Sequence, residues 1–302
     1  MRIKKRTLKL WLLLIVILAA AYFLFHSRHR TSDVYIFSNN LFSYSEKRPA
    51  PVAEVVGTTI PPQAECATGL SPICNDSENY TLSELVIQSR DAKLSAYLLV
   101  PKAKQQHERK VGVVLLAGAG VDKNGELGFA KVLANEGFTV LTYDQRSAGR
   151  TVVEKATQEP ESHKSVYDAL ASFDYLRESE KIGKVLMAGE SLGGRTAIIA
   201  ASMDNRIYGV LAISTSGYGT VADPYYYSIN PDNYFDGIKG RKIAFVHSTS
   251  DTVIPIAFAE QTFQRAGEPK KFFKLNGCTH GYCPQMKSQA LDALQWVLNS
   301  TA

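Results

Sequence analysis

Cysteine is scarce in this chain, and neither internal repeats nor a second domain can be seen. The 302 residues include four cysteines, too few for a disulfide-dense scaffold that lacks a hydrophobic core. With 45% hydrophobic and 21% charged residues, the composition also excludes a disordered or collagen-like chain. The length allows one large α/β domain or two small ones.

Acidic residues are absent from the first thirty positions, which changes the meaning of the net charge. The whole chain has a formal charge of +5 at pH 7. Seven basic side chains lie in residues 1–30: Arg2, Lys4, Lys5, Arg6, Lys9, Arg28 and Arg30. The other 272 residues hold 27 basic and 29 acidic side chains, a balance of −2. A near-neutral body gives no reason to expect a nucleic-acid partner.

The basic residues flank an unbroken apolar run from Leu10 to Phe25. Counted with its flanks (7–26), the stretch has about 20 positions, the length that spans a bilayer. Five basic residues precede the run and two follow it, which predicts a cytoplasmic N-terminus. We therefore expect residues 1–30 to be a cytoplasmic tail and a transmembrane signal anchor. The rest of the chain would then be periplasmic, extracellular or lumenal.

A cleaved signal peptide is the competing interpretation of this segment. Ala19-Ala20-Ala21 resembles a small-residue cleavage site, but the apolar run continues to Phe25 beyond it. No cysteine follows the run closely, so a lipoprotein would have no anchor residue. Both interpretations export the body, and cleavage would make it a secreted protein.

The cysteines fall in two close pairs, both in the part expected to be exported. Cys66 is near Cys74, and Cys278 is near Cys283. We hypothesise two local disulfides, whose main effect would be to stiffen short loops. Four free thiols are the alternative. The spacings do not match a four-cysteine metal site, and we expect neither a metal nor another cofactor.

Two regions follow the N-terminal segment. Residues 31–80 have little periodicity and scattered prolines, so we interpret them as a tether and an irregular N-terminal arm. In residues 81–302, short apolar runs alternate with amphipathic stretches, which predicts a mostly parallel sheet with helices on both faces. An aromatic insertion at about 216–240 interrupts the pattern. The expected strands are 85–87, 94–100, 111–116, 139–143, 185–188, 210–213, 243–246 and 271–275, and the expected helices are 129–135, 165–178, 192–202, 256–265 and 285–298.

The strongest chemical signal is Gly189-Glu190-Ser191-Leu192-Gly193, between an expected strand and an expected helix. In this context the pattern predicts a nucleophile elbow, a turn too tight for large side chains two positions before and after the serine. The turn exposes the Ser191 hydroxyl at the carboxyl edge of the sheet, and the helix N-terminus favours developing negative charge. The alternative is that Ser191 only caps the helix.

A serine nucleophile needs a base, and the base needs an acid that orients it. In this architecture both follow the serine, the acid first. Asp251 follows strand 243–246 and His280 follows strand 271–275, so both fall in loops at the carboxyl ends of strands. We therefore expect Ser191, Asp251 and His280 to form a catalytic triad. The fallback acids lie in the aromatic insertion: Asp223, Asp232 and Asp236.

Acyl transfer also needs hydrogen-bond donors for the oxyanion. The backbone N–H of Leu192, next to the nucleophile, is expected to be the first. The second should come from Ala117-Gly118-Ala119-Gly120, which follows strand 111–116. Small residues in this segment let the backbone approach a substrate.

Residues 84–300 resemble the α/β-hydrolase family, in its branch of serine esterases, dienelactone hydrolases and prolyl peptidases. The resemblance includes the elbow, the acid and histidine loops, and the stretch from Tyr143 to Arg150, which is similar to the family's D-x-R-G-x-G-x-S sequence. The family's His-Gly oxyanion turn corresponds to Ala117-Gly118, which implies that Ala119 provides the second donor. The resemblance implies no cofactor.

Two residues depart from the family pattern. Ala117 stands where the family has a histidine, which affects the shape of the oxyanion loop more than its role. Ser147 stands where the family has a glycine. The second change implies that Arg146 braces its loop and does not take part in catalysis.

These features predict a membrane-tethered, extracytoplasmic serine hydrolase that cleaves a carboxylic ester or related acyl substrate through an acyl-enzyme. The insertion 216–240 is expected to form a small lid and an apolar acyl pocket, with plain surface packing as the alternative. A peptidase or acyltransferase with the same triad is the competing function, and a non-catalytic binding protein on a hydrolase fold is a third. The expected partners are a small acyl substrate and the membrane; the sequence leaves the oligomeric state open.

Overall fold

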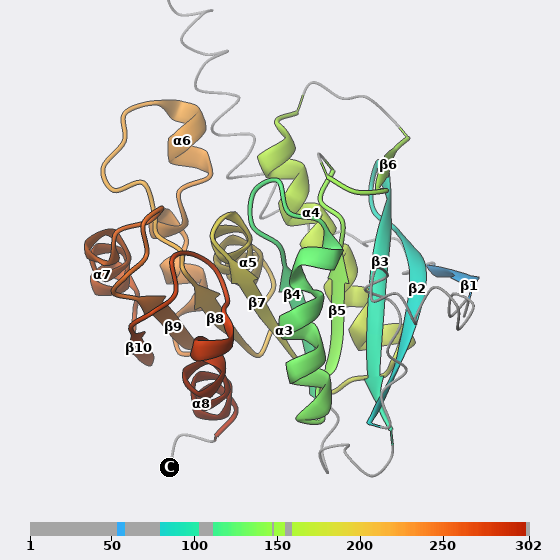
Figure 1. The fold of residues 1–302 in the computed structure, drawn as a ribbon. Coiled ribbons are helices and arrows are strands. Elements are labelled where there is room, and N and C mark those ends of the chain that lie inside the picture. The colour runs from blue at the N-terminus through green and yellow to red at the C-terminus, as the bar shows by residue number, and fades with distance from the viewer. Residues whose placement is uncertain (1–52, 58–78, 103–110, 147, 155–158, 300–302) are drawn as a thin grey trace, which may run out of the picture. The chain divides into compact units, whose positions relative to one another are not determined.

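The apolar runs form the centre of one mixed β-sheet in the computed structural model, which describes residues 53–57, 79–102, 111–146, 148–154 and 159–299 (Figure 1). The described strands form a ten-stranded sheet in the order β1-β2-β3-β5-β4-β7-β8-β9-β10, with β6 paired to β3. Their bounds are Ala53–Gly57 (β1), Tyr80–Gln88 (β2), Ala92–Pro101 (β3), Val111–Leu116 (β4), Thr139–Tyr143 (β5), Val152–Val153 (β6), Lys184–Glu190 (β7), Gly209–Ile213 (β8), Lys242–Ser248 (β9) and Lys270–Leu275 (β10).

Strand direction divides the sheet into two parts. The neighbours from β5 through β4, β7, β8 and β9 to β10 are all parallel. The pairs β1–β2, β2–β3 and β3–β5 are antiparallel. Every residue of β4, β5 and β8 is buried, as expected of strands covered on both faces. Loops at the carboxyl ends of the parallel strands therefore meet along one edge of the sheet.

Helices cover both faces of the sheet and create a separate hydrophobic core on each. Residues of α3 and α8 pack on one face, and residues of α4 and α5 pack on the other. Their bounds are Lys123–Asn135 (α3), Glu161–Asp174 (α4), Leu192–Met203 (α5), Pro224–Ser228 (α6), Ile256–Arg265 (α7) and Lys287–Leu298 (α8). This is the expected α/β arrangement of a sheet between two helical layers.

Several elements differ from the sequence-based expectation. The arm expected to be irregular over residues 31–80 contains β1, which pairs with β2. The helix expected at 129–135 begins at Lys123, because Asp122 caps it by accepting hydrogen bonds from the N–H groups of Asn124 and Gly125. Two glycines in the first turns, poor helix formers, concealed this start. The helix expected at 165–178 begins at Glu161, ends at Asp174 and continues as a π-helical turn to residue 179.

The expected N-terminal anchor and the Cys66–Cys74 pair lie outside the described residues. The chain divides into two units, residues 1–47 and 48–302, and the described residues all belong to the second. Within those residues, none of the helices combines the length and the apolar character that crossing a membrane requires.

Candidate active site

Ser191 occupies a strained turn between β7 and α5. Its φ of 51° lies in the left-handed region, which is unfavourable for a residue with a side chain. A Cβ on Gly189 would lie 2.4 Å from main-chain atoms of Gly193, and a Cβ on Gly193 would lie 2.2 Å from Leu116 O. The Ser191 side chain makes no capping hydrogen bond to α5. The geometry is therefore that of the expected elbow, and the helix-cap alternative is not supported.

His280 and Asp251 form a close pair. His280 Nδ1 lies 3.0 Å from Asp251 Oδ1 and 2.9 Å from Oδ2. The Asp251 side chain has no exposed surface, whereas that of His280 is 24% exposed. A second link joins the two loops, because Thr252 N donates to Thr279 O at 2.7 Å. The acid is buried and the histidine faces an accessible space, as general-base catalysis requires.

Two backbone groups and a second histidine hold Asp251 in place. Oδ1 accepts hydrogen bonds from the N–H groups of Val253 at 2.9 Å and Ile254 at 2.8 Å. His247 is buried, with Nε2 2.8 Å from Ile254 O and 3.5 Å from Asp251 Oδ2. Burial lowers the pKa of His247, so this histidine is neutral near pH 7. The acid is therefore held by its own loop as well as by His280.

The elbow and the histidine loop contact each other through the residues beside Ser191 and His280. Glu190 Oε2 accepts a hydrogen bond from Tyr282 N at 2.9 Å. Ser191 N donates to Ile213 O at 2.9 Å. The hydroxyl of Ser191 makes no hydrogen bond to His280 within the part of the chain that the structure describes; such bonds often tighten only when substrate binds.

The segment expected to supply the second oxyanion donor lies beside the nucleophile. A Cβ on Gly118 would lie 3.7 Å from Ser191 Cβ. The next residue, Ala119, is exposed. Leu192 is the first residue of α5, and an N–H at this helix position has no partner within the helix. Leu192 is therefore at the elbow and Ala119 follows a residue beside Ser191, and their roles as oxyanion donors stay a prediction.

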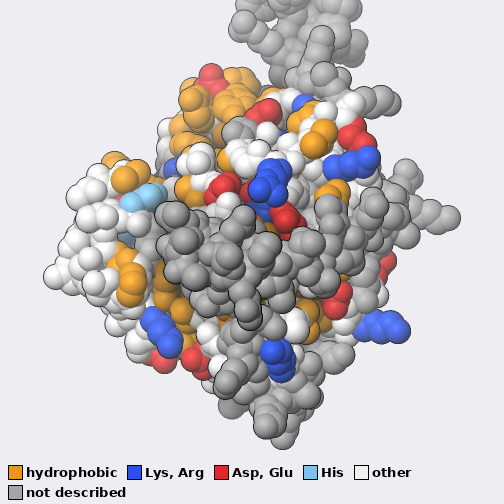
Figure 2. Space-filling model, turned by 45° about the vertical axis from the view of Figure 1, so that its right-hand side comes forward, with side chains coloured by type: hydrophobic (Ala, Val, Ile, Leu, Met, Phe, Trp, Pro, Cys, Tyr) orange, Lys and Arg blue, Asp and Glu red, His pale blue; other side chains and the backbone are white. Residues whose placement is uncertain are grey.

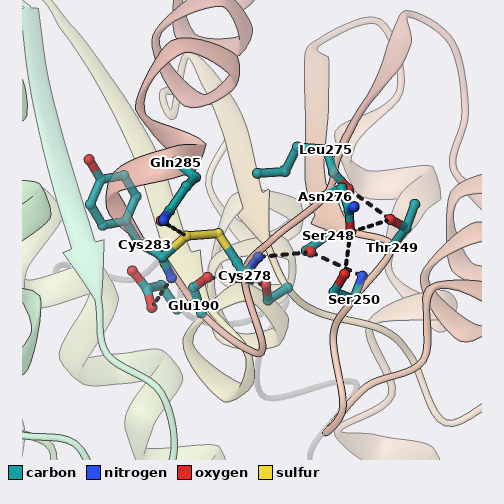
Figure 3. Close-up of a disulfide and its surroundings, with 12 residues drawn as sticks. Glu190, Ser248, Thr249, Ser250, Leu275, Asn276, Cys278, Cys283 and Gln285 are labelled. Carbon is teal, nitrogen blue, oxygen red and sulfur yellow. Dashed lines mark hydrogen bonds between the residues drawn. A yellow bond between two sulfur atoms is a disulfide. The ribbon is translucent and has the colours of Figure 1, made fainter.

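A disulfide joins Cys278 and Cys283 across the histidine loop, as hypothesised from their spacing. Figure 3 shows this bond with Glu190 on one side and the loop after β9 on the other. Cys278 N donates to Ser248 Oγ at 3.2 Å. The disulfide therefore closes the segment that carries His280, and its first cysteine attaches that segment to the end of β9.

A buried acid, Glu126, lies against the partly buried Glu190 of the elbow, and sequence reasoning missed this pairing. Glu126 on α3 is 2% exposed, and its carboxyl is hydrogen-bonded to that of Glu190. Burial and the negative charge of Glu190 raise the pKa of Glu126 to about 9. Burial also raises the pKa of Glu190. The sequence did contain one signal for this pair, the carboxylate of Glu190 inside the elbow. Its partner, Glu126, lies in the first turns of α3, which were not predicted to be helical.

Arg146 lies in a buried ion-pair cluster, in agreement with the expected bracing role. Its guanidinium donates to Asp168 Oδ2 at 2.6 Å and to Asp91 Oδ1 at 2.6 Å. Asp168 also accepts from Ser89 at 2.5 Å. These contacts join the β2–β3 turn, α4 and the loop after β5. Ser147 lies outside the described residues.

The insertion contains α6 and two 3₁₀ turns, Pro231–Asn233 and Phe235–Ile238. Phe235 is buried in the core, whereas Tyr225, Tyr226 and Tyr227 are 39%, 47% and 51% exposed. Figure 2 shows hydrophobic side chains gathered at the top of the molecule, the level at which Figure 1 places α6.

The three fallback acids are placed differently from Asp251. Asp223 caps α6, Asp232 forms an ion pair with Arg265 at 3.0 Å, and Asp236 is exposed. None of them is paired with His280 in the described residues, because His280 contacts Asp251.

A cavity of about 220 Å³ lies between the loop after β8 and α7. It is lined by residues 216–219 and by Phe258, Gln261, Thr262 and Arg265. Thr215, immediately before this loop, donates its hydroxyl to Ser191 O at 2.6 Å. Ser216, the first residue that lines the cavity, therefore follows a residue that is hydrogen-bonded to the elbow. Among the described residues, no group of three or more His, Cys, Asp or Glu side chains is arranged to hold a metal ion.

Known proteins share the architecture of this chain. Residues 107–224 match the family model described as serine aminopeptidase, S33, a hydrolase. No curated protein sequence matches the chain. Similar solved structures include the acetyl xylan esterase from Paenibacillus sp. R4, with 14% identity, a TM-score of 0.65, and coverage of 89% of this chain and 95% of that one.

Two further esterases have the same fold. Acetyl xylan esterase 1 from Thermoanaerobacterium sp. JW/SL YS485 is 14% identical, with a TM-score of 0.58 and coverage of 88% of this chain and 94% of that one. Est1E from Butyrivibrio proteoclasticus, solved with ferulic acid bound, is 18% identical, with a TM-score of 0.58 and coverage of 70% and 97%. At these identities the likeness concerns the fold.

Proposed function

We propose that this chain, which has the α/β-hydrolase fold, is a serine hydrolase that cleaves carboxylic esters with Ser191, His280 and Asp251 as the triad. The observation that carries the proposal is the His280–Asp251 pair, with Nδ1 2.9 Å from Oδ2, in a loop attached to the elbow through Glu190 and Tyr282. A buried acid that orients an accessible histidine beside a strained serine is the arrangement that activates a hydroxyl at neutral pH.

The reaction follows from these positions. His280 Nε2 takes the proton of Ser191 Oγ as that oxygen bonds to the ester carbonyl carbon. Asp251 keeps the proton of His280 on Nδ1 and stabilises the imidazolium that forms. The N–H groups of Leu192 and Ala119 bind the oxyanion, and the helix N-terminus adds to its stabilisation. The alcohol leaves with the proton from His280, and water then hydrolyses the acyl-enzyme in the same way.

Short acyl groups are the substrates that we propose. The cavity after β8 has a volume of about 220 Å³, below the roughly 300 Å³ at which pockets for drug-sized ligands begin, and its lining includes none of the three triad residues. Arg265 and Gln261 make part of its wall polar, and the apolar acyl pocket expected from the sequence stays a prediction. Two solved structures with the same fold are acetyl xylan esterases, which supports an acetyl-sized acyl group here. The exposed tyrosines of α6 would contact the alcohol portion as a small lid.

A peptidase is the second candidate, because the matching family model is that of serine aminopeptidases. The same triad would attack an amide, and the difference between the two functions is the binding of the leaving group.

Hydrolysis of p-nitrophenyl esters of graded chain length, compared with aminoacyl p-nitroanilides, separates the two functions. We expect the acetyl ester to give the highest kcat/KM and the anilides to give little turnover. Ser191→Ala and a fluorophosphonate probe provide the control, since labelling must depend on Ser191. Turnover that survives Ser191→Ala would contradict the triad, and faster anilide than ester turnover would favour the peptidase.

We also propose that the catalytic domain is extracytoplasmic and tethered by residues 1–30. The support is the apolar run between basic flanks, which fits a signal anchor with a cytoplasmic N-terminus. The disulfide between Cys278 and Cys283 fits an oxidising compartment. Membrane fractionation, followed by protease treatment of sealed vesicles or intact cells, tests this topology. Full-length protein in the soluble cytoplasmic fraction would refute it, and a processed, soluble, exported protein would favour signal-peptide cleavage.

A further inference from the structure

Two acidic side chains meet beneath the site, and the proposed reaction does not use them. The carboxyls of Glu126 and Glu190 are hydrogen-bonded to each other. Two carboxylates cannot donate to one another, so this bond requires a proton on one of them. Glu126 Oε2 is buried and, within the described residues, has no N–H or O–H donor in reach. A proton on Glu126 satisfies this carboxyl by making it the donor.

The pair contacts three loops of the site at once. The Glu126 carboxyl accepts a hydrogen bond from the N–H of Gly118, in the loop expected to bind the oxyanion. Glu190 Oε2 accepts from Tyr282 N at 2.9 Å, in the loop that carries the base. Glu190 itself precedes the nucleophile.

The histidine loop approaches the pair unusually closely at Gly281. Its φ is 68°, and a Cβ at this position would lie 2.6 Å from Glu190 Oε2. Any residue with a side chain would therefore push the loop away from the carboxylate. The titratable groups that face the pair from this loop are His280 and Tyr282, and α3 and β7 provide Glu126 and Glu190 themselves.

We propose that Glu126 and Glu190 are positioning residues that share a single proton, hold the three loops together, and place one negative charge beside His280. The proposal rests on the proposed function, since it concerns the same triad. It assigns the proton to Glu126 and the charge to Glu190. That charge favours the imidazolium that forms when His280 takes the serine proton, in addition to the effect of Asp251.

The shared proton explains why a buried acid is tolerated next to a second, partly buried one. Two adjacent carboxylates in a buried site would repel each other and separate the loops that they join. Burial and the charge of Glu190 raise the pKa of Glu126 to about 9, so the proton stays in place through neutral pH. As the pH rises through this value the pair gains a second charge, and the arrangement is lost.

Glutamine substitutions test the two roles separately. Glu126→Gln keeps a donor to Glu190 and an acceptor for Gly118, but it cannot ionise. Glu190→Gln removes the charge beside His280, and Glu126→Ala removes the bridge. The matched control is Glu136→Gln, an exposed acid at the end of the same helix, which should leave activity unchanged.

The expected readouts are kinetic and pH-dependent. Wild-type kcat/KM for p-nitrophenyl acetate should fall at alkaline pH with a midpoint of about 9, and Glu126→Gln should remove that fall. Glu190→Gln should lower kcat about tenfold with little change in KM, and Glu126→Ala should lower it further. Identical kcat, KM and pH profiles for the three variants and the wild type would overturn the proposal.

Two measurements keep the outcome separate from that of the proposed function. Infrared difference spectra of Glu126→Gln against the wild type should show loss of one protonated-carboxyl band. Amide exchange at Gly118 and Tyr282 should accelerate in Glu126→Ala but not in Glu136→Gln. If the wild type neither hydrolyses esters nor reacts with a fluorophosphonate, the proposed function fails. The proposal for Glu126 and Glu190 is then tested by the infrared spectra and amide exchange alone. Absence of the protonated-carboxyl band, or amide exchange that is unchanged in Glu126→Ala, overturns it.

Discussion

Replacing Asp251 by asparagine keeps the shape of the side chain but turns one of its two hydrogen-bond acceptors into a donor. Oδ1 accepts from the N–H groups of Val253 and Ile254, and an amide oxygen can serve these donors equally well. The amide nitrogen then takes the place of Oδ2, 2.9 Å from His280 Nδ1. Oδ1 also lies 3.0 Å from Nδ1 but already accepts from two backbone N–H groups. The donating nitrogen therefore favours a His280 that accepts on Nδ1 and carries its proton on Nε2, the atom that should take the proton of Ser191.

The magnitude follows from the burial of this pair. In serine proteases the same change lowers kcat by about 10⁴-fold without disturbing the geometry, which corresponds to ~5.5 kcal/mol of activation free energy. The Asp251 side chain has no exposed surface, so water cannot replace the lost acceptor. We therefore expect Asp251→Asn to lower kcat by a similar factor while the fold is retained.

The assay is steady-state hydrolysis of p-nitrophenyl acetate, with thermal unfolding measured on the same preparations. Asp236→Asn is the matched control, since this exposed acid was one of the sequence-based alternatives. It should hydrolyse the ester at the wild-type rate. The reasoning is refuted if Asp251→Asn keeps more than a tenth of wild-type kcat while it unfolds at the wild-type temperature. Loss of activity in Asp236→Asn instead would point to the wrong acid.

Three further outcomes test the elbow, the disulfide and the insertion. Gly193→Ala should destabilise the protein by ~2 kcal/mol or more in urea unfolding, because the added Cβ would lie 2.2 Å from a main-chain oxygen of β4. An unchanged urea midpoint would contradict the tight turn. The double variant Cys278→Ser/Cys283→Ser should lower kcat several-fold. It should lower the free energy of unfolding by at most ~2 kcal/mol, since the closed loop is short. Activity equal to that of the wild type would show that the disulfide does not position His280. Burial lowers the pKa of His163 to about 4, so protonation of this side chain should destabilise the folded protein in acid. The free energy of unfolding should fall by up to ~3 kcal/mol as the pH falls from about 6.5 to 4, because the unfolded state takes up the proton first. His163→Gln should remove that part of the loss in pH-dependent unfolding, and an unaltered pH dependence would count against it.

The positions of the triad residues could be predicted because the physical requirements are local. A tight strand-to-helix turn needs small residues at fixed offsets, and Gly189 and Gly193 meet this requirement within five positions. An acid and a histidine directly after buried parallel strands are brought to the same edge by the sheet. Asp251 and His280 each follow such a strand, so their pairing required no knowledge of the rest of the structure.

The buried acid pair could not be predicted in this way. Glu126 reaches Glu190 only because α3 begins six residues earlier than expected and packs against the site. The capping by Asp122 that fixes this start competes in the sequence with two nearby glycines that disfavour helix. β1 was missed for a related reason. Among the described strands its five residues pair only with β2 at the edge of the sheet, and so short an element has little periodicity.

The edge of the sheet that is formed by β10 affects how the protein behaves at high concentration. Among the strands that the structure describes, β10 pairs only with β9, so its outer side is an edge to which another polypeptide can add a strand. Half of its six residues are lysines: Lys270, Lys271 and Lys274. Bringing two such strands together would place like charges opposite one another. This edge therefore opposes aggregation by strand addition, and the protein can keep an open sheet without joining it to a second molecule.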